Sequence, residues 1–271
     1  MARLLWWCSI AAATACLVGG CHGEPPPEVA AKRAAAELAP IADEKTQLVT
    51  VLSDDWNEFR AVLRRYERAP GEKWVAVGKP IHAVLGREGY GWGRGLHGSG
   101  APPGRSGPTK YEGDGRSPAG VFELGTVYGY AAEHAELELP YVQATDSLRC
   151  VDDSRSRNYN RIVSTENTEV DWSSAEHMRR DDELYVLANV VEHNSEPTRG
   201  GSGSCIFLHL WEGPDKGMSG CTAMGMDELQ ALAAWLRPGA SVLLALPRGE
   251  YEALKRPWGL PIPSAFVPRM K

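Results

Sequence analysis

The apolar positions along the chain predict a domain built mostly of β-strands. Short apolar runs that are rich in β-branched or aromatic residues and bounded by turn residues are typical of strands. Such runs span residues 47–52, 73–77, 81–85, 184–191, 205–211 and 241–246. The runs at 73–77 and 81–85 flank Gly78-Lys79-Pro80 and predict a strand pair. Between Gly86 and Gly125 glycine and proline are dense, so we expect short strands and tight turns there.

Two stretches have helical spacing instead. Ser53 suits a helix N-cap, and it is followed by four apolar residues at intervals of three or four, namely Trp56, Phe59, Leu63 and Tyr66. This pattern predicts a helix near the N-terminus of the domain. The second stretch, residues 226–236, carries Leu229, Ala233 and Leu236 on one face and ends before Pro238-Gly239.

Many short strands with few helices are typical of a β-sandwich or a β-barrel. The fold class we expect is therefore mainly β, with one helix near the start of the domain and one after Cys221.

The extreme N-terminus has the pattern of an export signal. Arg3 precedes a mostly apolar stretch at residues 4–18, and Gly19, Gly20 and Cys21 follow it. A charged start, a short apolar core and small residues at the end are typical of a secretory signal peptide. Residues 17–21 also resemble a bacterial lipobox, in which the cysteine is lipidated. We expect residues 1–20 to be the signal peptide of a lipoprotein anchored through Cys21. An ordinary signal peptide or an uncleaved anchor are the alternatives.

The remaining chain divides into three parts. Residues 21–45 contain Pro25 to Pro27 and an Ala-rich charged stretch, which predict a tether, although a helix packed on the domain is an alternative. Residues 46–250 form the folded domain, and residues 251–271 a C-terminal extension. The expected location is the periplasmic face of a membrane in the cell envelope. His22 after Cys21, in place of an aspartate, favours the outer membrane in a cell with two membranes.

Composition excludes some classes of function. The 43% hydrophobic and 24% charged content is that of an ordinary globular protein. The net charge of −6 argues against a nucleic acid partner, because phosphate binding needs a basic face. After residue 20 there is no apolar run of about 20 residues, the length that spans a bilayer. We expect contact with the membrane only through the N-terminal lipid.

Export changes the interpretation of the cysteines. Cys8 and Cys16 lie in the signal peptide and Cys21 at the lipidation site, so the domain keeps Cys150, Cys205 and Cys221. An odd number in an oxidising compartment predicts one disulfide and one free thiol. Their number alone leaves the pairing open.

His209 and Cys221 are the strongest candidates for chemistry. His209 lies in the predicted strand 205–211, a loop follows, and Cys221 comes directly after Gly220. A histidine fixed on a strand beside a cysteine in a turn is typical of a nucleophile and its general base. The amides of Gly220 and Cys221 would point together as an oxyanion hole. With His209 and the following helix nearby, we expect Cys221 to be largely thiolate near neutral pH.

Two segments resemble the L,D-transpeptidase (YkuD-like) family, whose enzymes cross-link peptidoglycan through a cysteine acyl-enzyme. One is residues 203–224, with His209, a loop and Ser219-Gly220-Cys221. The other is residues 110–122, whose lysine, glycines and acidic residues lead into Ser117-Pro118-Ala119-Gly120-Val121-Phe122. The segments are in the family's order, and the resemblance covers roughly residues 47–246. It implies an L,D-transpeptidase-like fold and catalytic domain.

The resemblance also implies roles for single residues. Cys221 would be the nucleophile, His209 the general base, and the Leu210 carbonyl would orient the imidazole. Two positions depart from the common pattern. Ser219 replaces a second histidine and Ala223 replaces an arginine, as in a divergent branch that includes hydrolytic members.

If Cys221 is the free nucleophile that the resemblance implies, Cys150 and Cys205 remain as the disulfide pair. The alternative is two unpaired buried cysteines. Lys110, Ser117, Tyr159 and Asn194 are further candidates for the substrate cleft.

Other polar residues are weaker candidates for a functional site. Glu176, Arg179 and Arg180 fit a solvated charged loop better than a substrate cleft. His177, His193 and His209 lack the short-spaced acidic partners of a metal site, so we expect no metal, and the implied chemistry needs no cofactor.

The function expected from the resemblance is acyl transfer on peptidoglycan stem peptides. Cys221 would form a thioester, which a diaminopimelate amine of a second stem then displaces. One alternative passes the same acyl group to water, as an L,D-carboxypeptidase or a peptidoglycan–protein amidase. A non-catalytic peptidoglycan-binding lipoprotein is the second alternative.

Overall fold

The computed structural model describes residues 39–262. The expected signal peptide at 1–20, the lipidation site Cys21 and the tether up to residue 38 lie outside the described residues. Within residues 39–262, no helix is long and apolar enough to cross a membrane.

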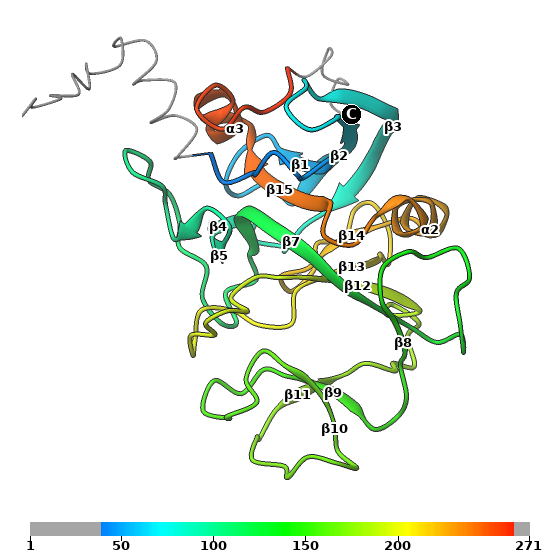
Figure 1. Ribbon diagram of the computed structural model, residues 1–271. Helices are drawn as coiled ribbons and strands as arrows, with labels where there is room; N and C mark the ends of the chain where they lie inside the picture. The colour runs from blue at the N-terminus through cyan, green and yellow to red at the C-terminus, as the bar shows by residue number, and fades with distance from the viewer. Residues whose placement is uncertain (1–38, 263–271) are drawn as a thin grey trace, which may run out of the picture.

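Ten strands form one sheet. They are β1 (Gln47–Ser53), β2 (Arg60–Glu67), β3 (Val75–Val84), β4 (Tyr90–Trp92), β7 (Ser117–Gly129), β8 (Tyr141–Gln143), β12 (Leu187–Val191), β13 (Phe207–Leu210), β14 (Thr222–Met224) and β15 (Ser241–Pro247). Their order is β12-β13-β14-β3-β2-β1-β15-β7-β4, with β8 beside β7. Because β12 also pairs with β7, the sheet closes into a barrel-like ring (Figure 1). The predicted mainly β fold is confirmed.

A separate three-stranded sheet lies below the closed sheet in Figure 1. It has the order β10-β9-β11 and consists of β9 (Leu148–Val151), β10 (Ile162–Ser164) and β11 (Ala175–His177). We call residues 145–182, which contain this sheet, the cap. The other elements are a two-stranded ribbon and two helices, β5 (Arg94–Gly95), β6 (Gly98–Ser99), α2 (Met226–Trp235) and α3 (Arg248–Leu254).

The prediction of a helix near the N-terminus of the domain is wrong, because residues 60–67 form strand β2 between β1 and β3. Ala61 and Leu63 are buried with the two-residue period of a strand. A bulge then shifts the register between Leu63 and Arg65, so the next buried residue is Tyr66. The bulge therefore produces the three-residue interval that imitates a helix.

The strand pair predicted around Gly78-Lys79-Pro80 is one strand, β3. Gly78 has a φ of +69° opposite the bulge in β2, and the strand continues through it. In the region where short strands were expected, β4, β5 and β6 are short, but β7 runs for 13 residues. The helix predicted after Cys221 is present as α2.

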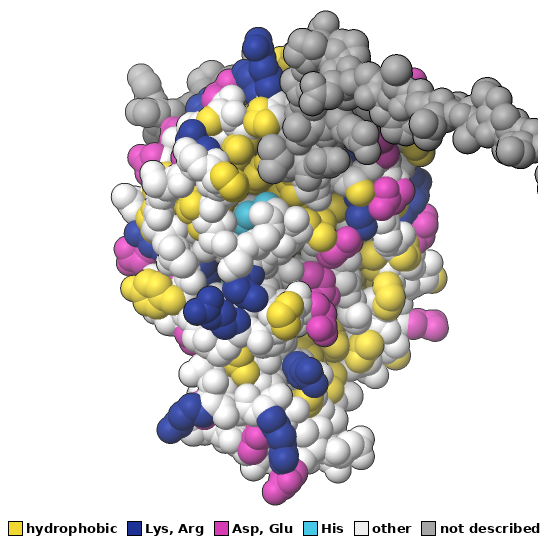
Figure 2. Space-filling view, turned by 60° about the vertical axis from the view of Figure 1, so that its left-hand side comes forward, with side chains coloured by type: hydrophobic (Ala, Val, Ile, Leu, Met, Phe, Trp, Pro, Cys, Tyr) yellow, Lys and Arg dark blue, Asp and Glu magenta, His cyan; other side chains and the backbone are white. Residues whose placement is uncertain are grey.

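The surface carries mixed charges. On the face in Figure 2, Lys and Arg side chains are interspersed with Asp and Glu. The large exposed hydrophobic residues are distributed over separate elements and loops, as is usual for a globular domain. They are Val75, Leu96, Tyr111, Val142, Val170 and Ile262.

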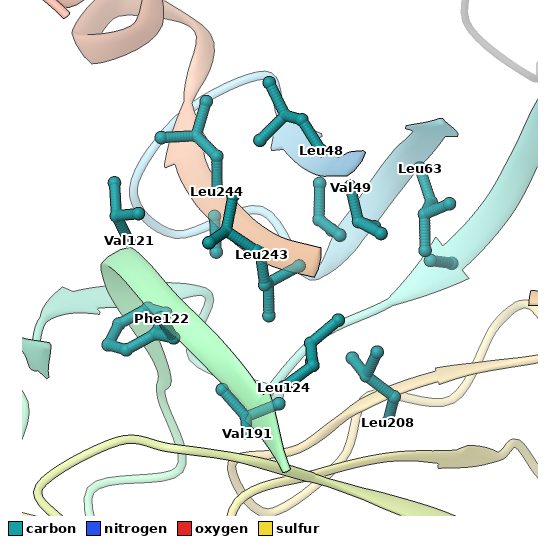
Figure 3. Close-up of a cluster of buried hydrophobic side chains, with 14 of the residues drawn as sticks. Leu48, Val49, Leu63, Val121, Phe122, Leu124, Val191, Leu208, Leu243 and Leu244 are labelled. Atoms are coloured by element: carbon teal, nitrogen blue, oxygen red, sulfur yellow. The ribbon is translucent and has the colours of Figure 1, made fainter. Parts of the chain in front are cut away.

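The main core lies between the strands of the closed sheet and the two helices. In Figure 3, Leu48 and Val49 of β1 and Leu243 and Leu244 of β15 pack with residues of β2, β7 and β13. Full burial of such a side chain contributes roughly 1.5–3 kcal/mol. The core includes Ile41 from the segment expected as a tether. It also includes side chains beyond residue 250, namely Tyr251, Leu254, Trp258 and Leu260.

Candidate active site

Strands β13 and β14 bring His209 and Cys221 to one face of the sheet. They pair in parallel, with Leu208 opposite Thr222 and His209 opposite Ala223. Side chains alternate along a strand, so Cys221, which directly precedes β14, faces the same way as Ala223 and His209.

The Cys221 thiol is buried, with 7% of the residue exposed. The Phe207 N–H donates to Sγ at 3.3 Å, and the thiol donates to the Cys205 carbonyl at 3.4 Å. Burial is the main cause that raises the thiol pKa to about 12, and the charge of Glu176 adds to it. The thiol is therefore the stable form in this structure.

The expectation that Cys221 is largely thiolate near neutral pH is wrong for this state. Strand β14 separates Cys221 from Met226, where α2 begins, so the thiol is not at the helix N-terminus. A helix dipole acts mainly within its first turn, and it cannot offset the burial of the thiol here.

His209 is held as a neutral base. Its Nδ1 lies 2.7 Å from the Leu210 carbonyl, the contact expected from the sequence. Because a carbonyl only accepts hydrogen bonds, Nδ1 carries the proton and Nε2 is the basic nitrogen. Burial lowers the pKa of His209 to about 4, although the Leu210 carbonyl favours the charged ring. The imidazole is therefore neutral and able to accept a proton near pH 7.

The structure brings His209 and Cys221 to one face without a hydrogen bond between them. Among residues 39–262, the backbone hydrogen bonds of the thiol go to Phe207 and Cys205. Contacts between a nucleophile and its base are often loose before substrate binds. A change in the thiol's rotamer is required before its proton reaches His209.

Ser117 holds the backbone at Cys221 in place. The Ser117 hydroxyl donates to the Cys221 carbonyl at 3.0 Å and accepts from the Gly86 N–H at 2.8 Å. A Cβ at Gly220 would lie 3.2 Å from the Arg116 carbonyl, so this close approach favours glycine. In the described part of the chain, the Gly220 and Cys221 N–H groups have no hydrogen-bond acceptor. They are available as oxyanion donors.

Lys110 adds a positive charge to this turn. Its Nζ lies 3.9 Å from the position of a Cβ on Gly220, and it is bound by the Asp114 carboxylate at 2.6 Å and the Tyr111 carbonyl at 2.8 Å. Lys110 is itself 5% exposed, so it supports the turn from inside. Ser219 is exposed beside it.

Tyr159 and Asn194, expected to line the substrate cleft, are buried supports instead. The Tyr159 hydroxyl donates to Glu112 at 2.5 Å and accepts from the Gly203 N–H at 3.1 Å. Asn194 is 2% exposed, and its amide binds the Arg199 and Gly203 carbonyls. Both residues hold the loop before Cys205, because the polar groups of that loop need buried partners.

A disulfide joins the cap to the strand that carries His209. Cys150 of β9 is bonded to Cys205, and Cys221 is the free cysteine among the described residues, as the sequence analysis expected. A pocket lies beside the disulfide and is lined by both cysteines, Tyr128, Val190 and Phe207 among others. Phe207, whose N–H binds Sγ, lines this pocket, but Cys221 and His209 are not among its lining residues.

Sequence reasoning missed Tyr185 and underrated Glu176. Tyr185 is 5% exposed, and its ring packs edge-on against His209 with 5.1 Å between centroids. Its hydroxyl donates to Glu176, at 2.5 Å. Glu176 is part of β11 and partly buried, so it does not belong to a solvated loop. The only signal in the sequence was the aromatic start of the apolar run 184–191.

Comparison with known proteins identifies the family. The sequence profile of the L,D-transpeptidase catalytic domain (YkuD) matches residues 41–244. The chain belongs to the L,D-transpeptidase catalytic-domain family. No curated protein matches it. The chain is also similar to the solved structure of Bdellovibrio bacteriovorus Bd1075, with 13% identity and a TM-score of 0.38. That match covers 78% of this chain and 54% of the Bd1075 chain, so it spans about half of that chain's length.

One departure from the common L,D-transpeptidase pattern has a structural basis. Ala223, which stands where the family often has arginine, is fully buried opposite His209 and Val84. An arginine would place an unpaired charge inside the sheet. Among residues 39–262, no group of three or more His, Cys, Asp or Glu side chains is arranged to hold a metal ion.

Proposed function

We propose that this protein is a cysteine acyltransferase that acts on peptidoglycan stem peptides. The observation that carries the proposal is the arrangement of His209 and Cys221 on one sheet face. The Leu210 carbonyl fixes the proton on His209 Nδ1, so Nε2 is the basic nitrogen. Membership of the L,D-transpeptidase family supplies the substrate class.

In the proposed reaction, His209 Nε2 takes the thiol proton and Cys221 Sγ attacks an amide carbonyl of the stem peptide. The N–H groups of Gly220 and Cys221 stabilise the oxyanion, and Ser117 keeps this turn in place. The protonated His209 gives its proton to the leaving amine, and a thioester remains on Cys221. An amine of a second stem, activated by the same imidazole, then displaces the thiol and restores the enzyme.

Hydrolysis of the same thioester is the second candidate. The alanine at position 223 favours it, because this chain lacks the cation that the common family pattern has there. Water in place of the amine would give an L,D-carboxypeptidase or an amidase.

We also propose that the enzyme works at the periplasmic face of a membrane, held by a lipid on Cys21. The charged start, apolar stretch and lipobox-like residues 17–21 support this location.

The test is a product analysis by mass spectrometry. The full chain is incubated with purified tetrapeptide stems, next to the Cys221→Ala variant. Cross-linked dimers indicate transpeptidation, and shortened stems without dimers indicate hydrolysis. The proposal predicts one of these products from the unaltered enzyme and none from Cys221→Ala. No turnover by a folded, unaltered enzyme, or equal turnover by the variant, would contradict it.

A further inference from the structure

Glu176 is fixed in the immediate surroundings of the nucleophile. Glu176 on β11 lies opposite Cys150 on β9, and Cys150 forms a disulfide with Cys205. The carbonyl of Cys205 in turn accepts the hydrogen bond of the Cys221 thiol. The cap therefore places a carboxyl group beside Sγ through one strand pair and one covalent bond. The charge of Glu176 raises the pKa of the Cys221 thiol, second only to burial.

Tyr185 connects this carboxyl group to the thiol. Its hydroxyl donates to Glu176 Oε2 at 2.5 Å, and Tyr185 packs in the same buried cluster as Cys221. The ring is held edge-on by Phe207 and His209, at centroid distances of 5.3 and 5.1 Å. The hydroxyl is thus bonded to the carboxyl group of the cap, while the ring packs in the cluster that contains the nucleophile.

The hydroxyl of Tyr185 has only one proton, so it serves one acceptor at a time. A hydrogen bond from Tyr185 to the thiolate lowers the pKa of Cys221. While Glu176 is ionised, its carboxylate holds that proton and also repels a thiolate. Neutralising this one charge would remove the repulsion and release the proton of Tyr185 toward Sγ.

The neighbouring charges compensate Glu176 only in part. Asp152 and Glu112 act on it with the same sign. Arg180 lies near, but its guanidinium is paired with Asp182 at 2.5 Å, and Lys110 is paired with Asp114 at 2.6 Å. Burial of Glu176 raises the pKa of its own carboxyl group, and the bond from Tyr185 partly offsets this. Of the two charges that act on the thiol pKa, that of Glu176 raises it more than that of Lys110 lowers it.

We propose that Glu176, acting through Tyr185, keeps Cys221 in its thiol form until a positively charged group reaches the carboxylate. Pairing with a cation neutralises Glu176, Tyr185 then donates to Sγ, and the thiolate forms as His209 takes the proton. The inference rests on the proposed function in one respect. The arriving cation would be an ammonium group of the stem peptide that lies next to the bond attacked by Cys221.

The test uses two small thiol reagents of similar size, so it does not depend on stem peptides. One is cationic 2-aminoethyl methanethiosulfonate and the other is neutral ethyl methanethiosulfonate. In each case the Cys221 thiolate attacks the reagent's sulfenyl sulfur, a mixed disulfide forms and methanesulfinate leaves. Rates are measured on the full chain at the Cys221 peptide by mass spectrometry, and divided by those of free glutathione.

We expect the normalised rate for unaltered Cys221 to be several-fold higher with the cationic reagent. In Glu176→Gln the neutral reagent should react about tenfold faster, which corresponds to a thiol pKa one unit lower. The preference for the cation should disappear there. Glu166→Gln, an exposed change in the same cap, is the matched control and should behave as the unaltered chain does.

Tyr185→Phe provides a second variant that keeps the ring. It should react several-fold more slowly with the cationic reagent, because the thiolate loses its donor, and the preference for the cation should become smaller. Equal rates and equal preference in Glu176→Gln and the unaltered chain would overturn the inference. Failure of the proposed function would be distinct, since it would abolish stem-peptide turnover and leave the labelling pattern unchanged.

Discussion

The closed sheet and the cap are stabilised in different ways. Every residue of β1 and β15 is buried, and most of these side chains are aliphatic. In the cap, β10 and β11 have no buried residue, and β9 has two, Cys150 and Val151. Polar bonds hold the cap loops instead. The Asp153 carboxylate, for example, binds the Ser173 N–H and hydroxyl at 2.9 and 2.7 Å.

This difference separates geometry from reactivity. The closed sheet fixes His209, Cys221 and the turn at Gly220 through strand pairing and apolar burial. The cap adds the disulfide and the carboxyl group of Glu176, which alters the ionisation of the thiol. A region that is weakly packed thus sets the chemistry of a site built on a rigid region, and each prediction below tests one side of this division.

The largest expected effect lies in the closed sheet. His209→Ala should lower kcat/KM for stem peptides by about two to four decades, the usual scale for loss of a general base. His82→Ala, an exposed change on β3, is the control and should have full activity. Steady-state kinetics provide the comparison. If His209→Ala is fully active, the general base lies elsewhere, and the closed sheet does not position it.

Breaking the covalent link should affect the cap first. The Cys150→Ala/Cys205→Ala double variant avoids a wrong bridge to Cys221. Closing a separation of 55 residues stabilises a chain by up to about 4 kcal/mol in the chain-entropy treatment. We expect a lower free energy of unfolding, faster hydrogen exchange in β9–β11 than in β1 and β15, and reduced activity. Equal loss of protection in all strands would show that the two regions unfold as one.

Acid should weaken the two regions in different pH ranges. Burial lowers the pKa of His97, His193 and His209 to about 4, and all three lie outside the cap. In the unfolded chain these histidines bind protons near pH 6.5. Their full contribution to the free energy of unfolding is therefore present above that pH and is lost as the pH drops toward 4. The upper limit is about 3 kcal/mol for each histidine.

The cap carboxylates lose their contribution to stability at a lower pH than the histidines do. The Ser173 hydroxyl is the main cause that holds the pKa of Asp153 below its usual value, so its contribution is lost only below about pH 4. Denaturant titrations at about pH 7, 5.5, 4 and 2.5, with hydrogen exchange as the local probe, check both ranges. Closed-sheet stability that is unchanged between pH 6.5 and 4 would contradict the neutral state of the three histidines.

The division also explains what the sequence predicted. The runs at 47–52 and 241–246 became buried strands because apolar burial is a property of the local pattern. The helix expected at Trp56 to Tyr66 failed because a bulge opposite β3 changed the spacing, and bulges depend on the partner strand. The Cys150–Cys205 disulfide and the free thiol of Cys221 are confirmed, and both followed from the recognisable motif around Cys221. The catalytic roles of His209 and Cys221 stay predictions.

Glu176 and Tyr185 could not be found in the same way. They are nine residues apart in the chain, but their bond at 2.5 Å depends on how the cap sits on the closed sheet. Asn194 was misplaced for a related reason, because a polar loop residue that supports its own backbone has the same sequence signal as one that binds substrate.

The acyl-enzyme itself is the central claim, and intact-mass spectrometry tests it most directly. The full chain is mixed with a tetrapeptide stem, and the reaction is quenched in acid within the first turnovers. The intact mass of the protein is then measured, and the modified residue is located by peptide mapping. The account predicts an added mass equal to the stem without its leaving amine, attached to Cys221 and absent in Cys221→Ala. Turnover of the stem with no adduct on Cys221, or an adduct that persists in Cys221→Ala, would contradict the account.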